Sequence, residues 1–169
     1  MTKFKRIISR LDIKEENLVK GIQLEGLRIL GDPLYFSKKY YDESIDELIY
    51  QDCIASLYGN NNLHTFISKI SKQIFIPLTV GGGIRNIEDI KKALYSGADK
   101  VAVNTAVIKN INFLKEATEI FGSSTISISI EAVFVFESTS IAIAVAPLLV
   151  ISDSIIFKIS IGLMFESAL

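Results

Sequence analysis

The chain has little of what several classes of protein require. Its 169 residues include one cysteine, one histidine and no tryptophan. A single cysteine, Cys53, excludes an internal disulfide, and without a cluster of His and Cys residues we expect neither a metal site nor a cofactor. An excess of positive charge is also lacking, since 18 Lys and Arg are set against 19 Asp and Glu. We therefore expect no nucleic-acid partner.

Long apolar runs are lacking too. The first residues, MTKFKR, lead into a strand-like run that is too short and too soon charged to be a signal peptide. After residue 132, the longest uncharged run, 138–152, has 15 residues and contains Pro147, whereas a membrane-spanning helix needs about 20. We expect a cytoplasmic protein with no membrane partner.

What the chain does have is an alternation of short β-branched runs with amphipathic stretches. The β-branched runs predict strands over 6–13, 47–52, 75–80, 100–104 and 125–131. Apolar residues at helical spacing predict helices over 63–74 and 87–94, the second capped by Asn86 and closed by Gly97. Asp32-Pro33 predicts the start of another helix, over 32–44, with Phe36 and Tyr40 facing inward. Residues 18–23 predict a small hairpin.

Strand, helix and strand in repetition indicate a parallel sheet of right-handed βαβ units. A doubly wound sheet would carry a G-x-G-x-x-G loop after its first strand, but here that strand ends in Asp12 and no glycine follows until Gly21. A (β/α)8 TIM barrel places its chemistry on loops after several strands. Polar or glycine residues end all five predicted strands, namely Asp12, Asp52, Gly81 to Gly83, Asn104-Thr105 and Glu131. The barrel is favoured, with the 18–23 hairpin over its mouth.

Three consecutive glycines, Gly81, Gly82 and Gly83, follow the third predicted strand. Glycines let the backbone approach a ligand closely and expose N–H groups, and the next helix would add partial positive charge, so this loop suits a phosphate. Asn104 and Thr105 can add side-chain donors from the neighbouring strand. The alternative is that the glycines only allow a tight turn.

Carboxylates at strand ends can act as general acids or bases, or can cap the next turn. Either role is open for any one of Asp12, Asp52 and Glu131, although three together favour a site. Lys20, in an apolar stretch soon after Asp12, is either a surface lysine or a residue facing the substrate. We expect His64 to be solvated and Cys53 to belong to the core, since no histidine partner for it is evident.

Five segments, taken in order, resemble the cyclase subunit of imidazole glycerol phosphate synthase. They are "RIISRLDIKEENLVKGIQLEGLRILGDP", "DELIYQDCIAS", "IFIPLTVGGGIR", "GADKVAVNT" and "FGS", within residues 4 to 132. The resemblance implies a (β/α)8 barrel and a lyase of histidine biosynthesis. Such an enzyme takes ammonia from a glutaminase partner and forms imidazole glycerol phosphate and an aminoimidazole carboxamide ribonucleotide from a phosphorylated precursor.

The resemblance also implies roles for individual residues. Asp12 would be the catalytic acid or base of the first strand, and Glu131 stands where a second carboxylate is expected near the reacting centre. Lys20 would contact the substrate from the first loop, and Asp52 would support the site. The residues implied to bind substrate are Lys20, Asp52, Gly82, Gly83, Asn104 and Thr105, the last four within one of two phosphate sites.

Two departures from the family pattern lie at or beside the predicted catalytic residues. The carboxylate of the fifth strand is usually Asp but here is Glu131, and the family's "CLD" is "RLD", with Arg10 in place of a small residue. Paralogues of the cyclase serve the amidation of surface-polysaccharide sugars, and "EGLRILGDP" with "ASLYGNNNL" is closer to those. The sugar-amidating reaction is therefore an alternative function.

After residue 132 the resemblance ends. A complete barrel needs about 250 residues, whereas 133–169 adds 37 residues, of which 4 are charged. We expect residues 4–132 to form about five strands of a barrel, and 133–169 to be a divergent apolar tail, a product of truncation or frameshift. The tail could instead be a membrane anchor or an ending that covers the open edge. We expect this chain to be inactive alone. An inactive phosphate-binding half barrel, self-associating through its open edges, is the other alternative.

Overall fold

Parallel strands form the centre of the fold in this computed structural model, which describes residues 5–22, 26–54, 63–130, 149–150 and 156–159. The sheet has the order β3-β2-β1-β4-β5-β6-β7-β9-β8. Its strands are β1 (Ile8–Lys14), β2 (Asn17–Ile22), β3 (Gly26–Gly31), β4 (Glu47–Asp52), β5 (Leu78–Gly81), β6 (Lys100–Val103), β7 (Ile126–Ile130), β8 (Leu149–Val150) and β9 (Ile156–Ile159). The helices are α1 (Pro33–Asp42), α3 (Leu63–Ile70), α4 (Ile87–Tyr95), α5 (Thr105–Lys109) and α6 (Ile111–Phe121).

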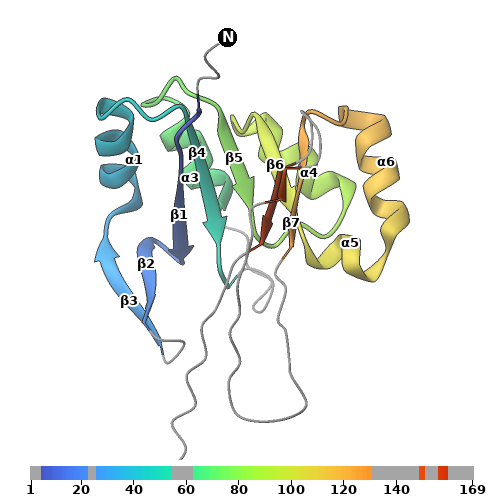
Figure 1. Cartoon of the computed structure of the whole chain (residues 1–169), viewed down its shortest axis with the longest axis horizontal. Coiled ribbons are helices and arrows are strands. Elements are labelled where there is room, and N and C mark those ends of the chain that lie inside the picture. The colour runs from blue at the N-terminus through green and yellow to red at the C-terminus, as the bar shows by residue number, and fades with distance from the viewer. Residues whose placement is uncertain (1–4, 23–25, 55–62, 131–148, 151–155, 160–169) are drawn as a thin grey trace, which may run out of the picture.

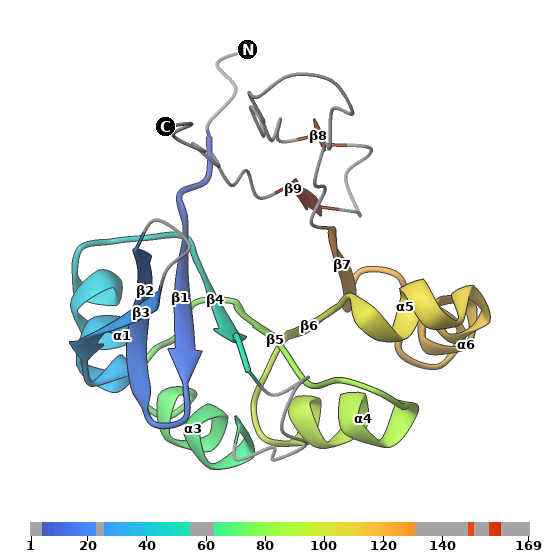
Figure 2. The same ribbon diagram turned by 90° about the horizontal axis from the view of Figure 1, so that it is seen from below.

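Five strands, β1, β4, β5, β6 and β7, are parallel, and neighbours in this series pair with each other. β1 pairs with β4, β4 with β5, β5 with β6 and β6 with β7, all in parallel. A parallel neighbour requires a crossover, which the helices between these strands provide. Figure 2 shows the five strands as an arc with α1, α3, α4 and α6 on its outer side. This confirms the predicted partial (β/α) barrel.

The two faces of the arc differ in chemistry because side chains alternate along each strand. One set of side chains packs against the helices and forms the apolar core, which includes Leu11, Ile13, Leu48, Tyr50, Val80, Val101, Val103 and Ile126. The alternate positions face the inside of the arc. The polar ones among them are Arg10, Glu47, Gln51, Thr79, Ser127 and Ser129, which line a small interior cavity together with apolar residues such as Ile8, Ile49 and Ala102. The inner face thus combines polar and apolar side chains.

The predicted starts of α1 and α4 and the glycine after α4 are confirmed, whereas the helix predicted over 63–74 ends at Ile70. Asp32 caps α1 by accepting a hydrogen bond from the Leu34 N–H, with Pro33 as the first helical residue. Asn86 caps α4 by accepting from the Asp89 N–H at 2.9 Å. Gly97 follows the end of α4 with a positive φ of 113°, a conformation that glycine adopts without strain.

One predicted strand begins later than expected, and one strand was not predicted. The predicted strand 75–80 begins only at Leu78, because Phe75 is 80% exposed and Pro77 has no N–H to give to a ladder. The 18–23 stretch is indeed one arm of a hairpin, β2, but its partner β3 was not predicted. The β2–β3 hairpin is antiparallel and projects beyond the carboxyl end of β1 (Figure 1).

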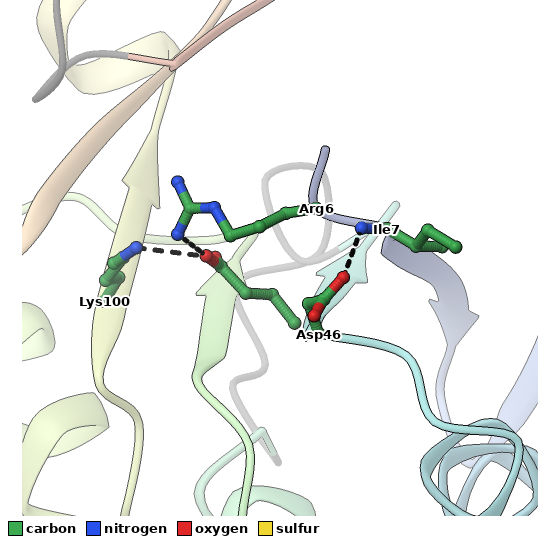
Figure 3. A network of polar contacts seen from close by, with 5 residues as sticks. Arg6, Ile7, Asp46 and Lys100 are labelled. Carbon is green, nitrogen blue, oxygen red and sulfur yellow. Dashed lines mark hydrogen bonds and ion pairs between the residues drawn. The ribbon is translucent and has the colours of Figure 1, made fainter. Parts of the chain in front are cut away.

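A buried carboxylate joins the amino-terminal ends of the strands. Glu47, 2% exposed, forms ion pairs with Arg6 and, at 3.4 Å, with Lys100. Beside it the Ile7 N–H donates to Asp46 Oδ2 at 2.6 Å. Figure 3 shows Arg6 and Lys100 converging from opposite sides. Two cations satisfy the buried Glu47, and they link the segment before β1 to β4 and β6.

Part of the tail lies along the sheet. β9 pairs in parallel with the end of β7, through Ser129↔Lys158 and Ile130↔Ile159, and β8 pairs with β9. The remainder of 133–169 lies outside the described residues. The domain boundary at residue 132 and the origin of the tail therefore stay predictions. Among the described residues, none of the helices has both the length and the apolar character needed to cross a bilayer.

Candidate functional site at the carboxyl ends of the strands

A cavity of about 560 Å³ opens at the carboxyl ends of the parallel strands. Its walls come from the end of β4, the glycine loop after β5, the β6–α5 junction and α6. Among its lining residues are Asp52, Gly82, Gly83, Asn104 and Thr105, five of the predicted site residues. Its size falls within the range of small-molecule pockets, about 300–1,000 Å³. The structure thus brings most of the predicted substrate-binding residues together.

The glycine loop has a structural reason for two of its three glycines. A Cβ on Gly81 would lie 2.4 Å from Gln51 Oε1, and a Cβ on Gly82 would lie 2.2 Å from the Asp52 carbonyl oxygen. Gly82 and Gly83 also have positive φ values of 103° and 70°. A side chain at Gly82 would therefore collide with the backbone at the end of β4 and cannot fit, whereas one at Gly81 would first displace the end of the Gln51 side chain. Gly83 lines the cavity. The tight turn and the phosphate loop are thus compatible explanations.

The expected contribution from the following helix is not seen. The Asp89 N–H donates to Asn86 Oδ1, and the Arg85 N–H donates to Asp89 Oδ2 at 3.0 Å. These side chains occupy donors at the amino end of α4, and the cavity lining ends at Arg85 without reaching the helix. Donors for an anion would instead come from the loop and from the β6–α5 junction.

Asn104 and Thr105, at the end of the strand next to β5, line the same cavity as the glycine loop. Asn104 precedes α5 with φ −138° and ψ −86°, and its side chain makes no capping hydrogen bond. Its buried Oδ1 has no hydrogen-bond partner among the described residues. A polar side chain that does not cap its helix and lines a cavity is available to a ligand.

Asp52 has the capping role that the sequence left open, and its role in proton transfer stays a prediction. Its Oδ1 accepts a hydrogen bond from the Ile54 N–H at 2.9 Å, which caps the turn after β4, and the residue also lines the cavity. Next to it, Cys53 is a poor nucleophile. Burial, followed by the carboxylate of Asp12, raises the pKa of the Cys53 thiol to about 11, so the thiol stays protonated at neutral pH.

Asp12 lies on β1, beside Gln51 of β4, and forms an ion pair with Arg10. The distance from Arg10 Nε to Asp12 Oδ1 is 2.5 Å. Arg10 lines the cavity, whereas Asp12 and Lys20 are not among its lining residues. Lys20 lies on the hairpin, opposite Arg28 of β3. The other predicted catalytic carboxylate, Glu131, lies outside the described residues.

Two residues were misjudged from the sequence. Arg10 was noted as a departure without a role, although it lies two positions before Asp12 and therefore on the same face of the strand. His64, expected to be solvated, is half-buried, and its Nδ1 lies 3.3 Å from Ser96 Oγ. It does not line the cavity. Among the described residues no group of His, Cys, Asp and Glu is arranged to hold a metal ion.

An arc of parallel strands, helices on its outer side and a cavity of loops at the carboxyl ends define a protein of the (β/α) barrel class. A family model described as "Histidine biosynthesis protein" matches residues 6–146. The chain belongs to this family. The match extends past residue 132, where the resemblance of the sequence motifs ended.

The relatives agree with the family. "Imidazole glycerol phosphate synthase subunit HisF" of Legionella pneumophila is 50% identical over 127 residues, which are 75% of this chain and 60% of the relative. Subunits of the same name from Petrotoga mobilis and Methanocaldococcus jannaschii are 43% and 47% identical over 128 residues, 76% of this chain and 51% and 47% of theirs. The chain thus spans about half to three-fifths of the length of these relatives. None of the three carries a name that refers to sugar amidation.

Proposed function

We propose that this chain carries the amino-terminal part of a cyclase-type active site, as in imidazole glycerol phosphate synthase. The reaction would be an ammonia-dependent lyase and ring-closing step that yields imidazole glycerol phosphate and an aminoimidazole carboxamide ribonucleotide. One observation carries the proposal. Asp52, the glycine loop and Asn104-Thr105 come from three different strand ends and line one cavity.

The proposed division of labour follows from the position of each group. The glycine loop, Asn104 and Thr105 would hold a phosphate of the substrate through N–H and hydroxyl donors. Asp12, on the adjacent strand, would exchange protons with the reacting centre. Ring closure needs one group that takes a proton and another that gives one, so a second group is required opposite Asp12. We assign that role, by the family resemblance, to an aspartate of the second half barrel, and we expect Glu131 near the reacting centre.

Ammonia would come from a glutaminase partner. The relatives are named as subunits of a synthase, which supports a partner in the assembly to which this chain corresponds. The cytoplasm as the place of the reaction stays a prediction.

Ammonia-dependent turnover tests the proposal. We expect the 169-residue chain alone to show little or no activity, because one positioned acid or base contributes about 10² to 10⁴ in rate. Addition of a separately produced second half barrel of the Legionella pneumophila relative should restore turnover, and Asp12→Asn should remove it again. Full activity of the unmodified chain, or restored turnover that survives Asp12→Asn, would contradict the assigned roles.

A second candidate is a phosphate-binding half barrel without turnover. It is favoured because the residues predicted to bind phosphate line one cavity, whereas no carboxylate partner of Asp12 is found among the described residues. Calorimetry with glycerol 3-phosphate distinguishes it from no function at this cavity. Gly83→Val should abolish binding, because a side chain blocks the approach to the backbone, while Gly21→Ala, with no atom within 4 Å of the added Cβ, should retain it.

A further inference from the structure

Asp12 has one polar partner among the described residues, the side chain of Arg10. Arg10 Nε donates to Asp12 Oδ1 at 2.5 Å. The two residues lie two positions apart on β1, so their side chains leave the strand on the same face. The other carboxylate oxygen, Oδ2, makes no hydrogen bond or ion pair with a described residue. One oxygen of Asp12 is thus held, and the other can take part in a reaction.

The guanidinium of this pair is enclosed by its surroundings. The Arg10 side chain is 19% exposed, and it lines both the cavity at the carboxyl ends and the small interior cavity within the arc. A guanidinium is planar and rigid, so little freedom is lost for each hydrogen bond that it forms. A bond between two charged groups is also shorter and stronger than one between neutral groups. Arg10 therefore offers Asp12 a donor with a defined position.

Other charged groups nearby do not take over this contact. Glu47, deeper in the arc, is held by two other cations and does not compete for Arg10. Lys20 is exposed on β2 and forms no ion pair with Asp12 among the described contacts. The Asp12 side chain is itself 38% exposed. Without Arg10, its carboxylate would turn about the side-chain bonds toward water, since an unpaired side chain keeps its rotamer freedom.

We propose that Arg10 is a positioning residue that fixes the Asp12 carboxylate with Oδ2 presented for proton transfer. The inference rests on the proposed function, in which Asp12 exchanges protons with the reacting centre. A general base must hold its oxygen about 2.6–3.2 Å from the atom whose proton it takes. A misplacement of about 1 Å can cost about 10²-fold in rate. A single bond that selects the rotamer of Asp12 therefore matters to the reaction.

The positioning is a feature of this chain and not of the family pattern. Where the family has "CLD", this chain has "RLD", so the small residue two positions before the aspartate is replaced by Arg10. A cysteine has neither the length nor the charge of a guanidinium. Its thiol is also a weak donor. The contact with Asp12 therefore depends on the departure itself.

NMR couplings test the positioning directly in the full 169-residue chain. Three-bond couplings from the Asp12 side-chain carboxyl carbon to its backbone N and C′ show whether χ1 has one staggered value or several. We expect one rotamer in the unmodified chain and averaged couplings in Arg10→Gln. Arg10→Lys, which keeps the charge but not the planar fork, should average partly. Asp99 is the matched control, because the Leu78 N–H holds its Oδ2 at 2.8 Å. Unchanged Asp99 couplings verify that each variant is folded.

Turnover tests the consequence for the reaction. The unmodified chain and its variants would each be combined with the second half barrel of the Legionella pneumophila relative. Arg10→Gln should lower kcat about 10- to 100-fold and change KM less than about twofold, because the residues proposed to bind substrate are unchanged. Arg10→Lys should recover part of kcat. A purely structural role would lower the melting temperature and leave the kcat of the folded fraction as it was.

The two measurements fail independently. If the unmodified chain shows no turnover with the second half barrel, the proposed function is wrong, and the couplings alone decide whether Arg10 positions Asp12. The Arg10 inference is overturned if Asp12 samples several rotamers in the unmodified chain, or if Arg10→Gln leaves its couplings unchanged. An Arg10→Gln variant that turns over with the unmodified kcat, or that changes KM alone, overturns it as well.

Discussion

Gly82 both packs against the end of β4 and lines the cavity, which makes its replacement informative. An added Cβ would lie 2.2 Å from the Asp52 carbonyl oxygen, and the φ of 103° is strained for any residue with a side chain. We expect Gly82→Ala to lower the free energy of unfolding by at least about 2 kcal/mol. Urea denaturation measures it. The matched control, Gly21→Ala, should change stability little, and equal effects of the two variants would contradict this explanation.

At the level of single residues, the sequence predicted which residues line the cavity better than it predicted what each of them contacts. Asp52, Gly83, Asn104 and Thr105 were predicted because strand ends of a parallel sheet share one edge, and they do line one cavity. The contact of Gly82 with the end of β4 could not be predicted, since it depends on how two strands meet in space. Arg10 could have been: spacing of two along a strand already places it with Asp12.

Among the helices, α4 begins with an N-cap residue, Asn86, that was predicted from the sequence. Asn86 Oδ1 accepts from the Asp89 N–H at 2.9 Å, so it satisfies a donor that the helix itself cannot. Asn86→Ala should cost about 1 kcal/mol of unfolding free energy. Thermal or urea melting measures the loss. Asn112→Ala, at an exposed position inside α6, is the matched control and should have a much smaller effect. A loss no greater than that of the control would mean that the cap contributes nothing.

Elements with local signals were the ones predicted correctly. The starts of α1 and α4 could be predicted because Asp32 and Asn86 cap residues only two or three positions further along the chain. β3 was missed because its apolar side chains face solvent at an edge, where no alternation marks a buried side. Leu27, Ile29 and Leu30 are 44%, 62% and 44% exposed. Helix α6 was not predicted either, although Phe113, Ala117 and Phe121 carry a helical period.

For the whole molecule, the open arc predicts association. Five parallel strands do not close a barrel, and the outer edge of β7 meets β9 through only the pairs Ser129↔Lys158 and Ile130↔Ile159. Uncovered sheet edges pair with other chains. We expect the chain to be dimeric or larger in sedimentation velocity at micromolar concentration.

A charge placed at this edge tests where the association occurs. Ile130, at the end of β7, is 37% exposed, and Ile130→Lys should shift the distribution toward monomer, because lysine disfavours edge pairing. Ile120→Lys makes the same change on α6, where the side chain is 55% exposed, and should leave the distribution as it was. An unmodified chain that sediments as a monomer and melts cooperatively would show that the described strands and the tail already make a compact unit.

The order of the strands has a consequence for how the chain is made. Along the parallel series, each strand pairs with the one synthesised just before it, from β1 through β4, β5 and β6 to β7. No parallel strand must wait for a distant segment, apart from the contacts of Glu47 with Lys100, 53 residues later. A ribosome that adds about 5–20 residues per second delivers one strand and one helix at a time, each with its pairing edge already in place. The arc can therefore grow at the pace of translation, one βα unit after another.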